Sequence, residues 1–360
     1  MRKKKSAFSK TLTVFGRIIA LLLVTLLGVA VVVGSVLNLF AHGPSETWRD
    51  RFVMTFKETS AMKFVPDLFL SQEEIAAISV NGDATGEVHE ISSDIEYEEV
   101  DTSLINISAE TEASGVDAWG LSDDDGDGII IDHVKGEGFS GYMMVVLDPS
   151  RVIMGSVPES FGVRGYSVEE MVKHYDGVAG INAGGFYDPN GQGNGSIPDS
   201  MVVFGGKVYY AGSGCRNGFA GFDADHILHV GKFTADEVQQ KNIQTGVSFG
   251  PVLVTNGEGT DPNLLDESVN PRTAIGQRSD GAVLLLVIDG RQITSLGASY
   301  QNLIDVMLSY GAVNACNLDG GSSSLMWFED KYINNGASFV GIRPVPTTFI
   351  VLKEGANANG

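Results

Sequence analysis

One uncharged run of 23 residues, Ile18–Phe40, limits most strongly what this chain can fold into. The run is apolar around its whole circumference, whereas a helix on the surface of a soluble domain keeps a polar face. A helix needs about 20 apolar residues to cross the hydrocarbon core of a bilayer. The apolar core of a cleavable signal peptide is usually shorter, about 7–15 residues. We therefore expect a transmembrane anchor over residues 18–40, with a signal peptide as the alternative.

The charges around this run predict its orientation. Residues 1–17 carry six basic side chains and no acidic one. Basic residues beside a first transmembrane segment favour the cytoplasmic side. We expect a cytoplasmic basic tail over residues 1–17, and a single-pass protein whose remaining residues lie outside the cell. The formal net charge of −21 argues against nucleic acid as a partner, because phosphate would be repelled.

Two segments separate the anchor from the glycine-rich remainder. Residues 41–80 indicate a juxtamembrane helical segment, because SETWRDRFVMTFKET has apolar side chains at helical spacing and Ser71 with Glu74 forms a capping box. Its apolar stripe is expected to pack on the globular domain, with the membrane surface as the alternative. Residues 81–127 hold 15 acidic side chains without a single Lys or Arg. Such a composition buries little, so residues 81–128 are expected to form an acidic linker.

A short acidic motif ends this linker. Asp123, Asp125 and Asp127 match the first half of a calcium-binding EF-hand loop. The complete loop needs a bidentate carboxylate at its twelfth position, where this chain has Val134. We therefore expect a solvated turn leading into a strand and no cofactor, with calcium as the weaker alternative.

Residues 129–354 consist of short strands separated by glycine turns, and residues 355–360 form a tail. The Gly205–Gly206 pair between MVVF and KVYY predicts a two-residue hairpin. GYMMVVLD and RVIMG are expected to be neighbouring strands, and YQNLIDVMLSYG is expected to be a helix. These patterns indicate an α+β fold with a mixed, largely antiparallel sheet and a few helices. Cys316 is expected to be a buried small apolar residue, and its pairing with Cys215 is left open.

Familiar catalytic motifs such as GxSxG, a Walker loop or HExxH do not occur in the sequence. His226 and His229 are spaced like metal ligands, but a strand would point them to opposite faces. Polar residues do end three apolar strands, and the groups concerned are Asn182, Asp289 with Arg291, and Asn317 with Asp319. A strand end holds a catalytic group rigidly while the following turn leaves it accessible.

A glycine turn follows two of these strands, and GGSSS follows Asp319. The amides of such a turn can form a nest for an anion. Each of these features also has an ordinary structural explanation, because Asp-Gly and Asn-Ala-Gly-Gly are common in turns. Their combination in one domain favours a functional site.

The string NPRTAIGQRSDGAVLLLVIDGR, together with GASYQNLIDVMLSYGAVNACNLDGGSSSLMW, resembles the phosphodiester glycosidase family. The resemblance covers roughly residues 130–353 and includes INAGGF and GIRPVPTTFIV, while the first 128 residues resemble only the bacterial membrane-anchored branch. The family run reads Asn-Leu-Asp-Gly-Gly-Gly-Ser-Ser, and here Ser322 replaces its third glycine. The resemblance implies a site built from Asn182, Arg272, Asp289, Arg291, Asn317, Asp319, Gly320, Gly321, Ser322, Ser323 and Arg343.

The same resemblance implies an enzyme that cleaves the C1–O bond between a sugar and a phosphodiester. Asp289 and Asp319 would be its catalytic carboxylates, since an oxocarbenium-like transition state requires a carboxylate nearby. The site's arginines would bind the phosphate as bidentate donors. We expect an extracytoplasmic hydrolase of phosphodiester-linked glycans in the cell wall or in exopolysaccharide. The alternatives are a non-catalytic glycan-binding module and a polysaccharide-assembly factor or transferase.

Overall fold

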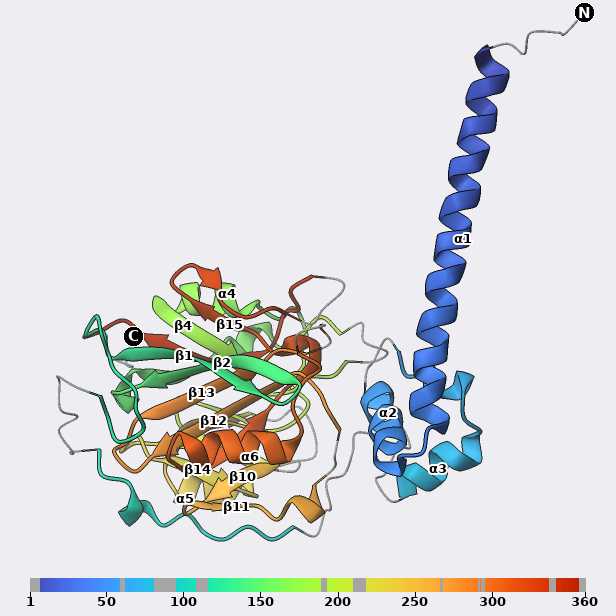
Figure 1. Cartoon of the computed structure of the whole chain (residues 1–360). Helices are drawn as coiled ribbons and strands as arrows, with labels where there is room; N and C mark the ends of the chain where they lie inside the picture. Colours follow the sequence, from blue (N-terminus) through green and yellow to red (C-terminus); the bar gives the residue numbers. More distant parts are fainter. Residues whose placement is uncertain are drawn as a thin grey trace, which may run out of the picture. The chain divides into compact units, whose positions relative to one another are not determined.

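The computed structural model describes residues 7–58, 62–80, 95–107, 116–188, 193–209, 218–265, 268–290, 292, 295–336 and 341–355. The chain divides into two compact units (Figure 1). The described residues up to Val80 form a helical unit, and those from Ile95 onward form the C-terminal domain.

The helical unit contains α1 (Ala7–His42), α2 (Glu46–Glu58) and α3 (Gln72–Val80), with a short 3-10 turn at Pro66–Leu68. Within α1, Val14–His42 is long and apolar enough to cross a membrane, as an anchor or as a signal sequence. The predicted capping box is present, because Ser71 N–H donates to Glu74 and Glu74 N–H donates to Ser71. The apolar stripe of α2 packs inside this unit, whose core consists of Ala41, Phe52, Val53, Val65, Leu70, Ile75 and Ile78.

The described strands of the C-terminal domain form three antiparallel sheets. The seven-stranded sheet has, in spatial order, β1 (Ile129–Gly136), β2 (Phe139–Val146), β13 (Val283–Ile288), β12 (Arg272–Arg278), β14 (Ala312–Leu318), β10 (Val252–Thr255) and β11 (Glu258–Gly259). One five-stranded sheet has β16 (Lys331–Tyr332), β15 (Met326–Phe328), β4 (Gly177–Asn182), β17 (Thr347–Leu352) and β3 (Val152–Ser156). The other has β6 (Lys207–Tyr209), β5 (Val202–Phe204), β9 (Ile243–Phe249), β7 (Gly218–Asp223) and β8 (Leu228–Gly231).

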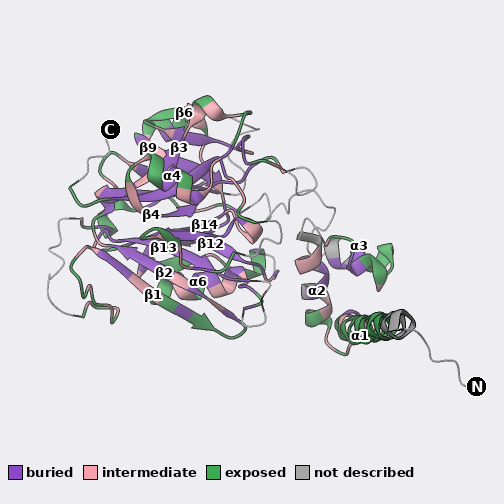
Figure 2. Ribbon diagram, turned by 90° about the horizontal axis from the view of Figure 1, so that it is seen from above, coloured by how far each residue is buried: buried purple, intermediate pink, exposed green. Residues whose placement is uncertain are grey.

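The main core lies between these sheets, where apolar strand faces meet (Figure 2). Cys316 is fully buried in it, as expected, whereas Cys215 lies outside the described residues. A second core covers the opposite face of the seven-stranded sheet. There α6 (Tyr300–Ser309) packs against β10 and β14 and buries Leu303 and Met307. The predicted α+β class is confirmed.

Local signals explain the remaining elements. Gly205 and Gly206 both adopt positive φ, as the predicted hairpin between β5 and β6 requires. Capping boxes begin the two short helices α4 (Val168–His174) and α5 (Ala235–Gln240). The expectation that GYMMVVLD and RVIMG are neighbours is wrong, because β2 pairs with β1 and β13 while β3 pairs with β17. A 3-10 turn at Pro149–Arg151, capped by Asp148, leads the chain from one sheet to the other.

The acidic segment differs from the expected linker. Residues 95–107 and 116–127, which we call the strap, contact the C-terminal domain where the structure describes them. Lys232 Nζ donates to Ile95 O at 3.1 Å, and Asp101 N–H donates to Asn256 Oδ1 at 2.8 Å. Val100 and Ile105 are buried. The prediction erred because these bonds use backbone groups and a few apolar side chains, which an excess of acidic residues conceals.

The second half of the strap surrounds a buried arginine. Arg278 is fully buried and pairs with Asp117 at 2.7 Å and with Asp280. Its guanidinium lies 3.7 Å from the centre of the Trp119 ring. Gly311 leaves room for this ring, since a Cβ there would lie 2.0 Å from Trp119 Nε1. The strap therefore supplies a charge partner that the domain needs.

Removing the strap should destabilise the domain. A chain that begins near Gly128 lacks Asp117 but keeps Asp280 beside Arg278, so the cost should lie below the roughly 3–5 kcal/mol of a buried charge left without any partner. We expect its urea midpoint to fall clearly below that of a chain that begins near Ile95. As a control, Lys353→Ala removes only an exposed ion pair with Asp176 and should cost at most about 1 kcal/mol. Equal midpoints for the two truncated chains would show that the strap contributes nothing.

Candidate active site

The site begins where two strands of different sheets end side by side. Asn182 is the last residue of β4, and Asp319 follows the last residue of β14. Asn182 Nδ2 donates to the backbone carbonyl of Asp319 at 2.5 Å. Its Oδ1 accepts from Thr273 Oγ1 at 3.0 Å and from Leu325 N–H at 3.1 Å. Asn182 is fully buried and therefore fixes the position of Asp319 from within the core.

The turn after Asp319 depends on its two glycines. Gly321 has a φ of +61°, in the left-handed region, and its N–H donates to Pro271 O at 2.8 Å. A Cβ on Gly320 would lie 2.7 Å from the same carbonyl oxygen. The N–H groups of Ser323 and Ser324 also donate within the turn. Three amides of the expected anion nest are thus already engaged, so an anion here would depend mainly on side chains.

Asp319 has an unusual electrostatic environment. Burial of its carboxyl group raises the pKa of Asp319 to about 7, although the residue as a whole is partly exposed. A hydrogen bond with Ser323 and the positive charge of Arg343 lower this pKa, while the negative charges of Asp199 and Asp188 raise it. An acid with a pKa near neutrality can both give and take a proton under ordinary conditions.

Arg343 joins the turn to the loop that follows β4. Its guanidinium pairs with Asp188 at 2.8 Å and donates to Ser322 Oγ at 3.1 Å. It also lies 4.9 Å from the centre of the Phe186 ring. Ser322, which replaces the family's third glycine, thus gives the turn a hydroxyl that Arg343 holds. This cluster combines one carboxyl that titrates near neutrality with a mostly buried cation.

The sequence analysis missed three members of this cluster. Phe186 and Asp188 lie just after INAGGF, and Asp199 precedes Ser200, whose hydroxyl donates to it at 3.0 Å. A Cβ on Gly185 would lie 2.8 Å from Asp199 Oδ2, which explains the second glycine of INAGGF. Asp188 and Asp199 lie in turn-like sequence, where aspartate is common for purely local reasons. Nothing in the pattern distinguished them.

Asp289, the second predicted catalytic carboxylate, accepts hydrogen bonds from two asparagines. Asn334 Nδ2 donates to its Oδ1 at 3.0 Å, and Asn335 N–H donates to the same oxygen at 2.9 Å. Burial raises the pKa of Asp289, and these hydrogen bonds oppose the shift. Asn334 also donates to Ser324 O at 3.0 Å, so Asp289 is tied to the glycine turn through one side chain.

Two predicted binding residues make contacts within the protein, and their binding role stays a prediction. Arg272 donates to Ser268 and to Ala298 O, and its guanidinium lies 3.9 Å from the centre of the Tyr300 ring. Asn317 Nδ2 donates to Gly250 O at 2.7 Å. The structure therefore brings together Asn182, Asp319, Gly320, Gly321, Ser322, Ser323 and Arg343. Arg291 lies outside the described residues.

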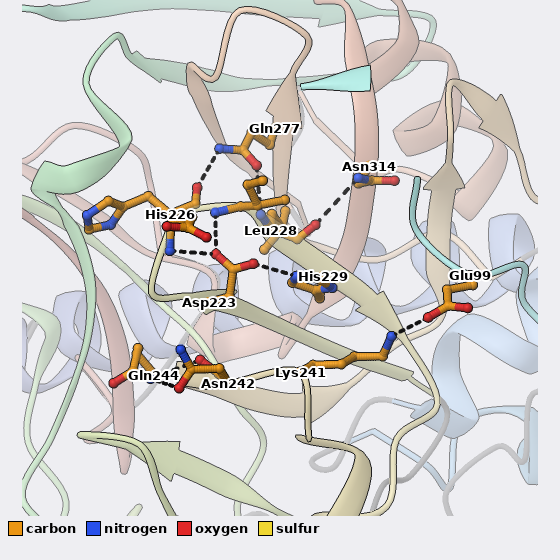
Figure 3. A network of polar contacts seen from close by, with 12 residues as sticks. Glu99, Asp223, His226, Leu228, His229, Lys241, Asn242, Gln244, Gln277 and Asn314 are labelled. Carbon is orange, nitrogen blue, oxygen red and sulfur yellow. Dashed lines mark hydrogen bonds and ion pairs between the residues drawn. The ribbon is translucent and has the colours of Figure 1, made fainter. Parts of the chain in front are cut away.

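A separate polar network contains the histidine pair (Figure 3). His229 Nε2 lies 2.8 Å from Asp223 Oδ2, while Gln277 accepts from Leu228 N–H and donates to His226 O. Only His229 of the two histidines is bonded to a carboxylate in this network, and the contacts connect β8 with β12. These contacts join β7 with β8, and β12 with β8 and the turn before it.

Among the described residues, one group of at least three His, Cys, Asp or Glu side chains could hold a metal ion. It consists of Asp123, Asp125 and Asp127, whose ligand atoms lie within 4.8 Å of one another. Asp123 accepts from the N–H groups of Gly126 and Gly128, as in a turn that caps its own amides. Calcium binding there stays the weaker alternative.

Comparison with known proteins agrees with the family resemblance. Residues 175–352 match the model of the phosphodiester glycosidase family. The chain is 34% identical over 182 residues to the SPbeta prophage-derived uncharacterized protein YomE of Bacillus subtilis, covering 47% of this chain and 27% of that protein. It is 26% identical over 218 residues to the human N-acetylglucosamine-1-phosphodiester alpha-N-acetylglucosaminidase, covering 54% and 41%. The chain thus spans well under half the length of these relatives.

The fold has a solved counterpart. The catalytic domain of the zebrafish N-acetylglucosamine-1-phosphodiester alpha-N-acetylglucosaminidase, auto-inhibited by its pro-peptide, superposes with a TM-score of 0.53. The likeness covers 69% of this chain and 87% of that one at 20% sequence identity, so it concerns the fold alone. Together with the match over residues 175–352, the strand ends and glycine turn described above identify the C-terminal domain of this chain as a member of the phosphodiester glycosidase family.

Proposed function

We propose that the C-terminal domain hydrolyses the C1–O bond of sugar-1-phosphodiesters. The observation that carries this proposal is the environment of Asp319. Burial raises its pKa to about 7, and the positive charge of the Arg343 guanidinium acts on the same carboxyl. The family match supports the reaction class, and the name of the human relative specifies a phosphodiester of N-acetylglucosamine.

The residues suggest how the bond would break. Arg343 and the hydroxyl of Ser322 bind the phosphate oxygens, since a guanidinium makes strong charge-assisted bonds to phosphate. Asp319, half protonated near neutrality, gives its proton to the departing oxygen. The phosphate monoester leaves with the bonding electrons. The oxygen of a water molecule joins C1, and the proton that this water loses returns the Asp319 carboxylate to its acid form. The negative charges of Asp188 and Asp199 stabilise the oxocarbenium-like transition state.

The membrane segment bears on where in the cell the C-terminal domain lies. We propose that α1 anchors the chain with its basic tail in the cytoplasm, because basic residues favour that side. The C-terminal domain then lies outside the cell, where phosphodiester-linked glycans of the wall or of exopolysaccharide are its substrates. Protease added to intact cells would digest the domain in this orientation.

Asp319→Asn should abolish hydrolysis without unfolding the domain. The assay incubates the full chain with UDP-N-acetylglucosamine or with wall teichoic acid and identifies free sugar and phosphate monoester by mass. Loss of an acid–base group typically costs at least ~10²-fold in rate. Asp289→Ala is the comparison, because it removes the bonds from Asn334 and Asn335 and should lower the melting temperature more than turnover. Near-normal turnover by the Asp319 variant would exclude this residue from the chemistry.

The raised pKa of Asp319 predicts how stability depends on pH. The folded state holds the proton more tightly than the unfolded chain, whose carboxyl has a pKa of 3.8. The tighter proton binding therefore contributes fully to the free energy of unfolding below pH 3.8, and this contribution is lost as pH rises through about 7. The side chain of the Asp319→Asn variant cannot ionise. The melting temperature of this variant minus that of the unmodified protein should therefore increase between about pH 4 and about pH 8. A constant difference across this range would contradict the shift.

The pH dependence of turnover should also reflect the protonation of Asp319. If Asp319 acts as the acid, the rate falls as pH rises through about 7. A rate that rises through this range would assign Asp319 the role of a base instead.

Arg343→Lys should weaken the enzyme although it keeps the charge. An ammonium group cannot contact Asp188, Ser322 and a phosphate in one plane as a guanidinium does. Loss of one charged hydrogen bond costs about 1.5–3 kcal/mol, so the ratio kcat/KM should fall roughly tenfold or more. Arg164→Lys is the matched control, because Arg164 makes an exposed ion pair with Glu170. Equal effects of the two substitutions would argue against a phosphate contact by Arg343.

A further inference from the structure

The end of α1 is part of the folded helical unit. Ala41 is 1% exposed and belongs to the same core as Phe52 and Val53 of α2. His42 Nε2 lies 3.0 Å from Phe69 O. Figure 1 shows α2 beside the C-terminal end of α1. The unit is therefore attached to the apolar helix by side-chain packing as well as by the chain.

This packing determines where the unit would lie relative to a bilayer. Val14–His42 has 29 residues, which gives a helix about 43 Å long. The hydrocarbon core is only about 30 Å thick, so the ends of the helix reach the headgroup regions. The uncharged run ends at Phe40, directly beside Ala41. Because α1 is continuous to His42, the unit packed on its last turns lies at the membrane boundary.

The surface of the unit suits that position. Trp48 is 49% exposed, and its ring centre lies 5.8 Å from that of Phe40. Phe64 and Leu68 are also exposed on the same unit. Tryptophan is enriched at membrane interfaces, where the ring contacts acyl chains and its N–H contacts the wet headgroups. An aromatic pair that connects the end of an apolar helix with the start of α2 fits this layer.

We propose that the part of the helical unit in residues 41–58 and 62–80 is an interfacial collar, which inserts Trp48 among the lipid headgroups of the bilayer that α1 spans. The collar also requires that α1 is retained, because cleavage after Ala41 would remove this residue from the core. This inference does not depend on the proposed reaction.

Lipids that carry bromine quench tryptophan fluorescence at contact and so measure the position of Trp48. The full chain is reconstituted into phosphatidylcholine vesicles, either unlabelled or brominated near the headgroup or near the end of the acyl chain. We expect quenching to be stronger with bromine near the headgroup. Trp48→Phe should remove most of this quenching, since the other two tryptophans, Trp119 and Trp327, belong to the C-terminal domain.

Trp327→Phe is the matched control, because Trp327 is buried in the C-terminal domain. It should leave the absolute loss of fluorescence on bromination unchanged, because only emission that the lipid cannot quench is removed. The proposal is overturned if Trp48→Phe leaves the quenching unchanged, or if quenching is absent, as it would be if protein covered Trp48. It is also overturned if N-terminal sequencing of the membrane-bound protein shows a chain that begins after Ala41.

Discussion

The side chain of Asn182 holds the two main sheets together at the site. It bonds to the carbonyl of Asp319, to the hydroxyl of Thr273 and to the amide of Leu325. These groups come from two sheets whose facing sides pack through apolar side chains, and apolar packing is non-directional. Apolar packing alone would tolerate small sliding movements between the sheets. The amide makes bonds with fixed directions and so fixes Asp319 relative to both sheets.

The glycines around this amide have the same effect on a smaller scale. Gly320 and Gly321 let the turn approach Pro271, and Gly185 leaves space for Asp199. The close approach at Gly185 concerns Asp199, whose negative charge raises the pKa of Asp319. The raised pKa of this carboxyl is therefore a property of backbone geometry as much as of its neighbours. Any substitution that forces these loops apart would return Asp319 toward an ordinary aspartate.

Local sequence signals predicted the fold class and part of the site. Apolar strands that end in polar residues placed Asn182 and Asp319 correctly, and the Gly205–Gly206 pair gave a true hairpin. The sheet to which each strand belongs did not follow, as β2 and β3 show, because short apolar runs look alike in sequence. Asp188 was missed because its partner, Arg343, is distant in the chain. Arg272 has the residue type expected for phosphate, but its strand face directs it toward Tyr300.

The strap is held to the domain by two ion pairs that differ in exposure. Lys241 and Glu99 meet at the surface, where the carboxylate side chain is 81% exposed. Arg278 is fully buried where it meets Asp117. Dissolved salt weakens the attraction between exposed charges, whereas buried ion pairs are screened much less. Rising ionic strength would consequently loosen the strap from its N-terminal end, near Glu99, while Trp119 stays in place over Arg278. The attachment is thus graded, with a salt-sensitive part nearer the membrane segment in the chain and a salt-resistant part nearer the sheet.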